Sequence, residues 1–319
     1  MQMFHVKQPG NIGKQEHIYY MKEFICKLCP RNCGAVRGET GNGRCGMGAL
    51  PRIARAAPHY DEEPVISGSR GSGAVFFSGC SLQCCFCQNF ALSHEGWGAE
   101  VSVDRLREIY FELIEQGVHN INLVNPTHFA HAILESLREG LPVPVVWNSG
   151  GYEKVETLRA LEGRVQVYLP DLKYITAESA RRYSGAEDYF AFAAPAIKEM
   201  LRQTGPVELD EDGIIRRGTI VRHLILPGRA EESVRILDFI REELPGAWVS
   251  LMAQYLPFGD AAGVDELGRR LTQKEYDLVA DHLIEIGLED GFIQELSSSD
   301  EKYIPKFDLT GVKAPEKEN

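Results

Sequence analysis

The chain has 319 residues, of which 44% are hydrophobic and 25% are charged, and its formal net charge is -12. This composition excludes a disordered chain, and the length is enough for a substantial core in one large domain or in a domain with a small appendage. The acidic balance excludes nucleic acid as the general partner, because the neutralisation of phosphates requires a basic surface.

Neither a signal peptide nor a membrane anchor is predicted at the N-terminus, because residues 1–20 contain no sustained apolar stretch. A run of about 20 apolar residues, the length that spans a bilayer, occurs nowhere in the chain. We therefore predict a cytoplasmic protein with no membrane partner. In the reducing cytoplasm, eight cysteines in two groups indicate metal sites rather than disulfides.

The first group of cysteines follows a polar, irregular stretch and has the spacing C-x2-C-x3-C-x11-C. Its members are Cys26, Cys29, Cys33 and Cys45. Four thiolates are enough for a closed tetrahedral site, and the glycines between the last two cysteines permit tight turns around it. A structural zinc ion and an auxiliary iron–sulfur cluster both accept four cysteines, so the sequence leaves these two alternatives open.

A polar run at residues 59–68 separates the two groups of cysteines, and it includes Asp61, Glu62 and Glu63. A polar run this close to a cysteine-rich loop can contribute side chains to a site, or it can be a solvated loop. The sequence favours neither interpretation.

The second group, Cys80, Cys84 and Cys87, has the spacing C-x3-C-x2-C and follows residues 74–77, an apolar run typical of a buried strand. Soft thiolates at this spacing indicate one soft metal centre, and three ligands leave a coordination position open for catalysis. The alternatives are a zinc knuckle with a distant fourth ligand and three buried cysteines. Cys85 lies inside the last spacing, and we expect it to take no part.

Strand and helix patterns alternate from residue 73 onward. The predicted strands are residues 73–79, 119–125, 143–149, 165–171, 218–226 and 247–256. The predicted helices are residues 102–117, 128–140, 153–162, 176–203 in one or two pieces, 231–243 and 272–287, with Ser102 and Thr272 as caps of the first and the last. Such β/α units predict an α/β fold with a parallel sheet and helices outside it, and six units rather than eight suit an incomplete barrel.

The cysteine loop, with an aromatic residue before its third cysteine and a strand before its first, resembles the cluster loop of the radical S-adenosylmethionine (SAM) superfamily. The resemblance implies that Cys80, Cys84 and Cys87 hold a [4Fe–4S] cluster to which SAM binds. It also implies a partial (β/α)6 barrel of the TIM type and an electron donor such as flavodoxin or ferredoxin. The implied activity is reductive cleavage of SAM to a 5′-deoxyadenosyl radical, which abstracts a hydrogen atom from a substrate.

Polar residues at the carboxyl ends of the predicted strands are candidates for cofactor binding, because chemistry in such barrels occurs at these ends. The candidates are Asn125, Thr127, His128, Asn148, Ser149, Asp171, Lys173, Arg222 and Gln254. The resemblance implies that several of them hold SAM, with the planar guanidinium of Arg222 at its carboxylate. Structural alternatives stay open: Thr127 can cap the next helix with His128 in its first turn, and Asp171 can form an ion pair with Lys173.

Motifs along residues 24–308 resemble the radical SAM branch labelled as PflX-like activating enzymes of pyruvate formate-lyase; they include Cys-Pro-Arg-x-Cys and Leu-Pro-Asp-Leu-Lys-Tyr. This resemblance implies activation of a glycyl-radical enzyme. However, the chain lacks the Gly-Gly-Glu motif at the second strand end and the histidine expected after Leu256-Pro257. Modification of another protein, a peptide or a small molecule is therefore an alternative. A non-catalytic protein of electron transfer or zinc-dependent partner binding is a third hypothesis.

These predictions divide the chain into three parts. Residues 1–68 form a small extension with the four-cysteine metal site, residues 69–288 form the partial barrel, and residues 289–319 form a C-terminal strap and tail.

Overall fold

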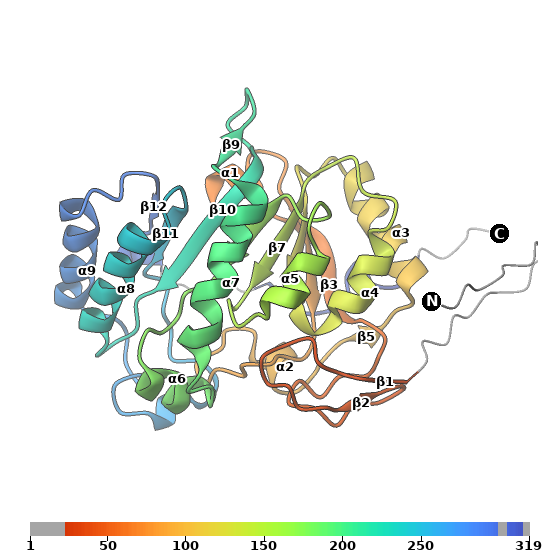
Figure 1. The fold of residues 1–319 in the computed structure, drawn as a ribbon, viewed down its shortest axis with the longest axis horizontal. Helices are drawn as coiled ribbons and strands as arrows, with labels where there is room; N and C mark the ends of the chain where they lie inside the picture. Colours follow the sequence, from red (N-terminus) through yellow and green to blue (C-terminus); the bar gives the residue numbers. More distant parts are fainter. Residues whose placement is uncertain (1–22, 299–304, 315–319) are drawn as a thin grey trace, which may run out of the picture.

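A ten-stranded sheet with helices packed against it forms the body of the computed structural model, which describes residues 23–298 and 305–314 (Figure 1). Its strands are β3 (Arg52–His59), β4 (Ser72–Phe77), β5 (Ala99–Glu100), β6 (Ile121–Val124), β7 (Val145–Ser149), β8 (Val167–Pro170), β9 (Glu208–Leu209), β10 (Ile215–Leu224), β11 (Trp248–Met252) and β12 (Gly291–Ile293). A separate two-stranded ribbon pairs β1 (Phe24–Ile25) with β2 (Val36–Arg37).

The sheet has the order β12-β11-β10-β8-β7-β6-β4-β3-β5, and β9 pairs with β10. Each pairing along the path from β4 to β12 is parallel, whereas β3 is antiparallel to both β4 and β5. Among the described residues no pairing joins β12 to β5, so the sheet is open. The predicted α/β fold, with its six parallel strands in sequence order, is confirmed.

The helices are α1 (Pro64–Ser67), α2 (Phe90–Ser93), α3 (Val103–Glu115), α4 (Ala130–Ser136), α5 (Val155–Ala160), α6 (Ala177–Ser184), α7 (Tyr189–Thr204), α8 (Ala230–Glu243) and α9 (Gln273–Glu285), with 3-10 turns η1 (Thr127–Phe129), η2 (Gly259–Gly263) and η3 (Leu296–Ser298). Figure 1 shows α8 and α9 at one end of the sheet and α3 and α4 toward the other. The helix predicted at residues 176–203 is two helices, because Gly185 ends α6 in the left-handed conformation.

Local signals explain where the helices begin. The hydroxyl of Ser102 accepts a hydrogen bond from the Arg105 amide at the start of α3. Thr272 and Glu275 form a reciprocal capping box at the start of α9. Both predicted caps are therefore confirmed, and caps of this kind stabilise a helix by about 1 kcal/mol.

The core lies between the sheet and its helices. All six residues of β4 and all four of β8 are buried, as expected for parallel strands that are covered on both faces. Trp147 and Tyr168 are fully buried on neighbouring strands. Burial of large apolar side chains, at about 1.5–3 kcal/mol each, therefore fixes the strand ends that carry polar residues. No helix in the described parts of the chain has the length and apolar character needed to cross a bilayer.

The sheet crosses both of the predicted domain boundaries. β3 lies in the predicted extension 1–68 but pairs with β4 along six residues, and β12 lies in the predicted strap 289–319 but pairs with β11. The parts of these two segments at residues 1–22, 299–304 and 315–319 lie outside the described residues. The part of the described chain that stands apart from the sheet ends before β3.

Candidate functional site: a cysteine loop over charged strand ends

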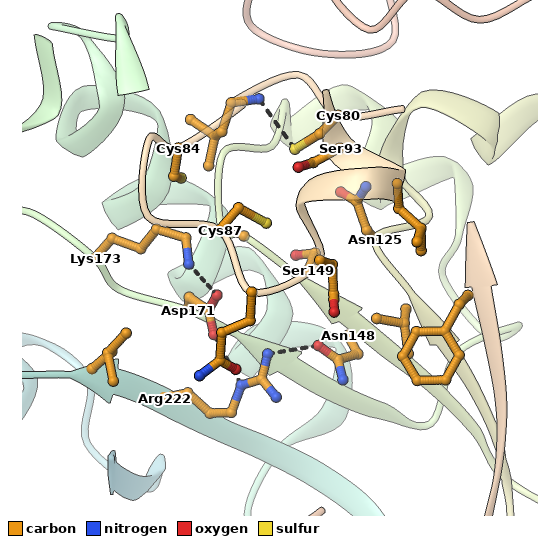
Figure 2. Close-up of a pocket in the computed structure, with 18 of the residues that line it drawn as sticks. Cys80, Cys84, Cys87, Ser93, Asn125, Asn148, Ser149, Asp171, Lys173 and Arg222 are labelled. Atoms are coloured by element: carbon orange, nitrogen blue, oxygen red, sulfur yellow. Dashed lines mark hydrogen bonds and ion pairs between the residues drawn. The ribbon is translucent and has the colours of Figure 1, made fainter. Parts of the chain in front are cut away.

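A cavity of about 250 Å³ lies at the carboxyl ends of the parallel strands, beside the loop that follows β4 (Figure 2). The loop contributes thiols and the strand ends contribute charged and amide side chains. The predicted site residues that line the cavity are Cys80, Cys84, Cys87, Asn125, Asn148, Ser149, Asp171, Lys173, Arg222 and Gln254. The structure thus brings together residues from six separate segments of the sequence, but Thr127 and His128 are not part of the lining.

Two backbone features set the course of the cysteine loop. Gly79 has a φ of +79°, and a Cβ at this position would lie 2.6 Å from the Cys45 carbonyl oxygen, so only glycine fits. Gln83, between the first two ligand candidates, also takes a left-handed φ of +52°. The Asn125 amide holds the start of the loop by donating to the Gly79 carbonyl at 2.5 Å. The turn directs the three thiols toward the strand ends (Figure 2).

Two of the three thiols accept a hydrogen bond within the protein. The bonds run from the Leu82 amide to Cys80 (3.4 Å) and from the Ser184 hydroxyl to Cys84 (3.0 Å). Ser184 in turn lies 2.8 Å from the Tyr174 hydroxyl in the buried interior. Such bonds orient metal-binding sulfurs and tune the centre that they hold.

The donor set in this cavity fits a soft metal centre. Burial raises the pKa of the Cys87 thiol to about 12 and also raises that of Cys80, so without a metal these groups stay protonated at neutral pH. In the described parts of the chain, no three Cys, His, Asp or Glu side chains meet closely enough to hold a single metal ion. Three thiols of one loop that line one cavity suit a [4Fe–4S] cluster, which cysteines bind at separate iron atoms.

An alternating array of charges lies across the cavity from the loop (Figure 2). Asp171 accepts from Arg222 Nε at 2.9 Å and from Lys173 Nζ at 2.5 Å. Burial alone would raise the pKa of Asp171, but the two cations outweigh it and hold that pKa below its usual value. Burial likewise opposes protonation of Lys173, but the Asp171 carboxylate raises the Lys173 pKa above its ordinary value. All three groups are therefore charged at neutral pH.

Glu62 completes this array from outside the predicted barrel. Its carboxylate lies 3.3 Å from Arg222 Nη1 and accepts from the side-chain amides of Asn122 and Asn148, each at 3.1 Å. Asn148 also accepts from Arg222 Nη2 at 2.7 Å. Burial raises the pKa of Glu62, and the positive charge of Arg222 partly opposes the rise.

Thr127 and His128 instead hold the structure beneath the cavity. Thr127 donates to the buried Glu153 carboxyl at 2.7 Å, and burial raises the pKa of Glu153. His128 Nε2 donates to the Ser78 carbonyl at 2.7 Å, just ahead of the cysteine loop. Burial and the nearby Arg37 lower the pKa of His128 to about 3, so the ring is neutral. His128 therefore contacts the backbone that leads into the site rather than the cavity itself.

The four-cysteine segment lies against the outside of the same loop. Cys26 and Cys29 are buried, Cys45 is partly buried and Cys33 is exposed. None of the four lines the cavity. Hydrogen bonds join the segment to the loop: Arg31 Nε donates to the Ser81 carbonyl at 2.8 Å, and Gln83 donates to the Arg44 carbonyl at 3.0 Å.

Comparison with known proteins finds a relative by sequence. No family model matches the chain. Over 262 residues the chain is 30% identical to the uncharacterized protein MJ0674 of Methanocaldococcus jannaschii, and the match covers 79% of this chain and 72% of the relative. The chain belongs to the family of MJ0674.

Solved structures resemble this MJ0674-family chain only distantly. SuiB of Streptococcus suis, bound to S-adenosylmethionine, has a TM-score of 0.46 at 14% identity over 68% of this chain and 48% of SuiB. Methylornithine synthase (PylB) has a TM-score of 0.45 at 14% identity over 67% of this chain and 68% of its own. HydG, a maturase of the [FeFe]-hydrogenase, has a TM-score of 0.49 at 13% identity over 75% of this chain and 56% of HydG. The chain thus spans about half the length of SuiB.

Sequence reasoning missed two contributors to the site of this MJ0674-family protein. Glu62 stood in a charged run for which a solvated loop was an equal alternative, and its burial against Arg222 appears only in the fold. Ser184 is 100 residues from the cysteine that it contacts. The pair Glu62-Glu63 ahead of the buried strand β4 was the available signal for the first; no local signal pointed to the second.

Proposed function

We propose that this protein is a radical SAM enzyme whose cysteine loop holds a [4Fe–4S] cluster and whose strand ends bind SAM. One observation carries the proposal: Cys80, Cys84 and Cys87 line the same cavity as the charged array of Asp171, Lys173 and Arg222. Three soft ligands leave an open coordination position, and the array supplies both signs of charge for a zwitterionic ligand. When bound, the cluster supplies one electron for the reductive cleavage of SAM.

The chain's own residues bind, orient and enclose the ligand in this proposal. The guanidinium of Arg222 donates to Asp171, Asn148 and Glu62, and the two N–H groups left at its edge can donate to a carboxylate or ribose oxygen. Lys173 places a second cation in the cavity that Cys84 also lines. The walls of the cavity at Leu82 and Phe86 are buried, and their low polarity strengthens the charges beside them.

For the substrate, we propose a backbone glycine of a partner enzyme, as the resemblance to activating enzymes implies, with flavodoxin or ferredoxin as electron donor. A small molecule is the alternative, and one observation favours it. The C-terminal segment runs beside the cavity: Pro305 lines it, and Phe307 packs edge-on against Phe76 at a centroid distance of 5.6 Å. A segment in this position narrows the approach for a polypeptide.

The proposed chemistry is tested by anaerobic reconstitution with iron and sulfide, reduction with dithionite, addition of SAM and measurement of 5′-deoxyadenosine. Wild type is expected to form the product and Cys84→Ala is expected to form none. Cys85→Ala is the matched control, because Cys85 neighbours the loop ligands but does not line the cavity, and it should retain activity. A fully loaded, reduced wild type without product would contradict the proposal and favour electron transfer or partner binding.

The two substrate classes are separated by the same assay with cell extract. If a protein is the substrate, the macromolecular fraction should stimulate 5′-deoxyadenosine formation and should acquire a radical signal in electron paramagnetic resonance (EPR). If a small molecule is the substrate, the filtrate should stimulate it instead, which would overturn the activating-enzyme proposal.

A further inference from the structure

Arg37, on β2 beside the four cysteines, is a buried cation without a carboxylate partner among the described residues. Its side chain is 1% exposed, and its guanidinium donates to the carbonyls of Gly48 and His128. It also lies over the rings of Phe24 and Phe129, with centroid distances of 5.7 and 5.1 Å. A buried charge without a counter-charge is costly, so the surroundings of Arg37 should supply a negative one.

Cys26 provides the nearest group in this surrounding that can carry a negative charge. Its Sγ lies 3.9 Å from Arg37 Nη1. The two histidines close to the guanidinium cannot balance it: His128 and His131 donate through Nε2 to the Ser78 and Ala49 carbonyls, and imidazole carries no negative charge. A lone thiol is neutral, but a thiol bound to a metal is a thiolate.

Tight glycine turns fold the chain between Cys33 and Cys45 back on itself. A Cβ at Gly41 would overlap the Met47 carbonyl oxygen, so this position admits no other residue, and a Cβ at Gly43 would lie 2.9 Å from Cys33 Sγ. The Ala49 amide closes the turn by donating to the Gly38 carbonyl at 2.7 Å. The Cys26 amide donates to the Ala35 carbonyl at 2.8 Å, which brings the chain beyond Cys33 beside Cys26.

We infer that Cys26, Cys29, Cys33 and Cys45 bind a second metal centre, closed by four thiolates, and that Arg37 is its buried counter-charge. Four thiolates around Zn²⁺ or around a [4Fe–4S]²⁺ cluster carry a net double negative charge, which the guanidinium partly neutralises. Occupation by a single ion requires the thiols to turn toward a common point, and the exposed Cys33 is the most free to do so. This inference does not rest on the proposed function.

The position of the centre gives it a structural consequence. The four-cysteine segment is bound to the cysteine loop that follows β4. Arg31 donates to the loop, Gln83 of the loop donates to the segment, and the Cys45 carbonyl packs against Gly79. Ordering of this segment by a metal would therefore also order the wall of the neighbouring cavity.

The test removes the other site first. The full-length Cys80→Ser/Cys84→Ser/Cys87→Ser variant is purified, or reconstituted with zinc or with iron and sulfide, and its metal and sulfide are quantified. The inference predicts about one zinc ion, or about four iron atoms with sulfide, per chain. The additional change Cys33→Ser should remove this metal, and Cys85→Ser should not. Zinc and iron distinguish the two forms of the centre; a folded triple variant that takes up neither would overturn the inference.

If the triple variant does not fold, Cys33→Ser in the otherwise unchanged chain decides the matter. Because Cys33 is exposed, its replacement disturbs no packing, and metal content should fall by one centre while the rest remains. An unchanged metal content would overturn the inference.

The counter-charge is tested by the release of metal to a chelator in Arg37→Met and Arg37→Lys. Loss of a partner of this kind lowers metal affinity by about 10–100-fold, so Arg37→Met should release metal faster by a factor in that range. Arg37→Lys keeps the charge and should lie closer to wild type. A merely structural role would lower thermal stability in both variants without separating their release rates, and equal rates would overturn the role of Arg37.

Discussion

The two cysteine groups of this chain offer the same kind of ligand, a thiol, but their surroundings differ in charge and in access to a cavity. The three-cysteine loop faces a cavity lined by Asp171, Lys173 and Arg222. None of the cysteines of the four-cysteine segment lines this cavity, and the neighbouring cation, Arg37, is bound to backbone carbonyls and aromatic rings. An open position with paired charges suits a site that binds a ligand, whereas a closed set of ligands with one buried counter-charge suits a site that holds structure.

Replacement of Arg222 should have the largest effect on stability and on SAM binding. It should leave the four-cysteine segment unchanged. Arg222→Met leaves the buried Asp171 and Glu62 without their shared cation, which is expected to lower the free energy of unfolding by about 3–5 kcal/mol and to abolish SAM binding. Thermal unfolding and equilibrium dialysis of the reconstituted protein measure the two effects. The metal of the four-cysteine segment should be retained; its loss would show that the two regions are not independent.

His223 gives a pH dependence on the cavity side. Burial lowers its pKa to about 4, while Nδ1 donates to the Leu172 carbonyl and Nε2 lies 2.8 Å from the Ser233 hydroxyl. The unfolded state binds a proton near pH 6.5 and the folded state does not, so stability is full above pH 6.5 and falls as pH drops toward 4.

His223→Gln should therefore reduce the slope of unfolding free energy against pH by up to about 1.4 kcal/mol per unit in this window. Urea unfolding at several pH values measures the slope. The pKa of His128 is also lowered, so part of the slope should remain in His223→Gln. A slope equal to that of wild type would contradict the neutral state of His223.

The hydrogen bond of Ser184 to Cys84 should shift the redox potential of a centre on the loop. Donors to a ligand sulfur favour the reduced form, so Ser184→Ala should make the potential more negative. A potentiometric titration monitored by EPR measures the shift, and Ser184→Thr, which keeps the hydroxyl, is the control. An equal shift in both variants would assign the effect to packing instead.

Thr127 should contribute least to ligand binding. Thr127→Val removes one hydrogen bond to Glu153, which keeps its bond from Trp147 Nε1, and is expected to cost about 1 kcal/mol of stability. SAM affinity, measured by equilibrium dialysis, should remain that of wild type. A clear loss of SAM affinity would indicate that Thr127 takes part in ligand binding. It would contradict the assignment of Thr127 to the structure beneath the cavity.

The parallel strands were predictable because continuous apolar runs recur between helical patterns, and the polar strand ends followed from them. Strand β3 was not predictable, because its sequence is rich in alanine and contains Pro58, and both residue types are uncommon in strands. β12 has three residues, too few for a pattern. The partners of Glu62 and His128 depend on tertiary contacts across 50 or more residues, which no local spacing encodes.

The central claim is that SAM binds at the three-cysteine loop and not at the four-cysteine segment. Its most direct test is the EPR spectrum of the reconstituted, dithionite-reduced protein with and without SAM, in Cys33→Ser and in Cys84→Ser. The account predicts a reduced-cluster signal in Cys33→Ser that SAM perturbs, and no SAM-sensitive signal in Cys84→Ser. Either of two results would contradict the account: an EPR signal in Cys33→Ser that SAM does not change, or an EPR signal in Cys84→Ser that SAM does change.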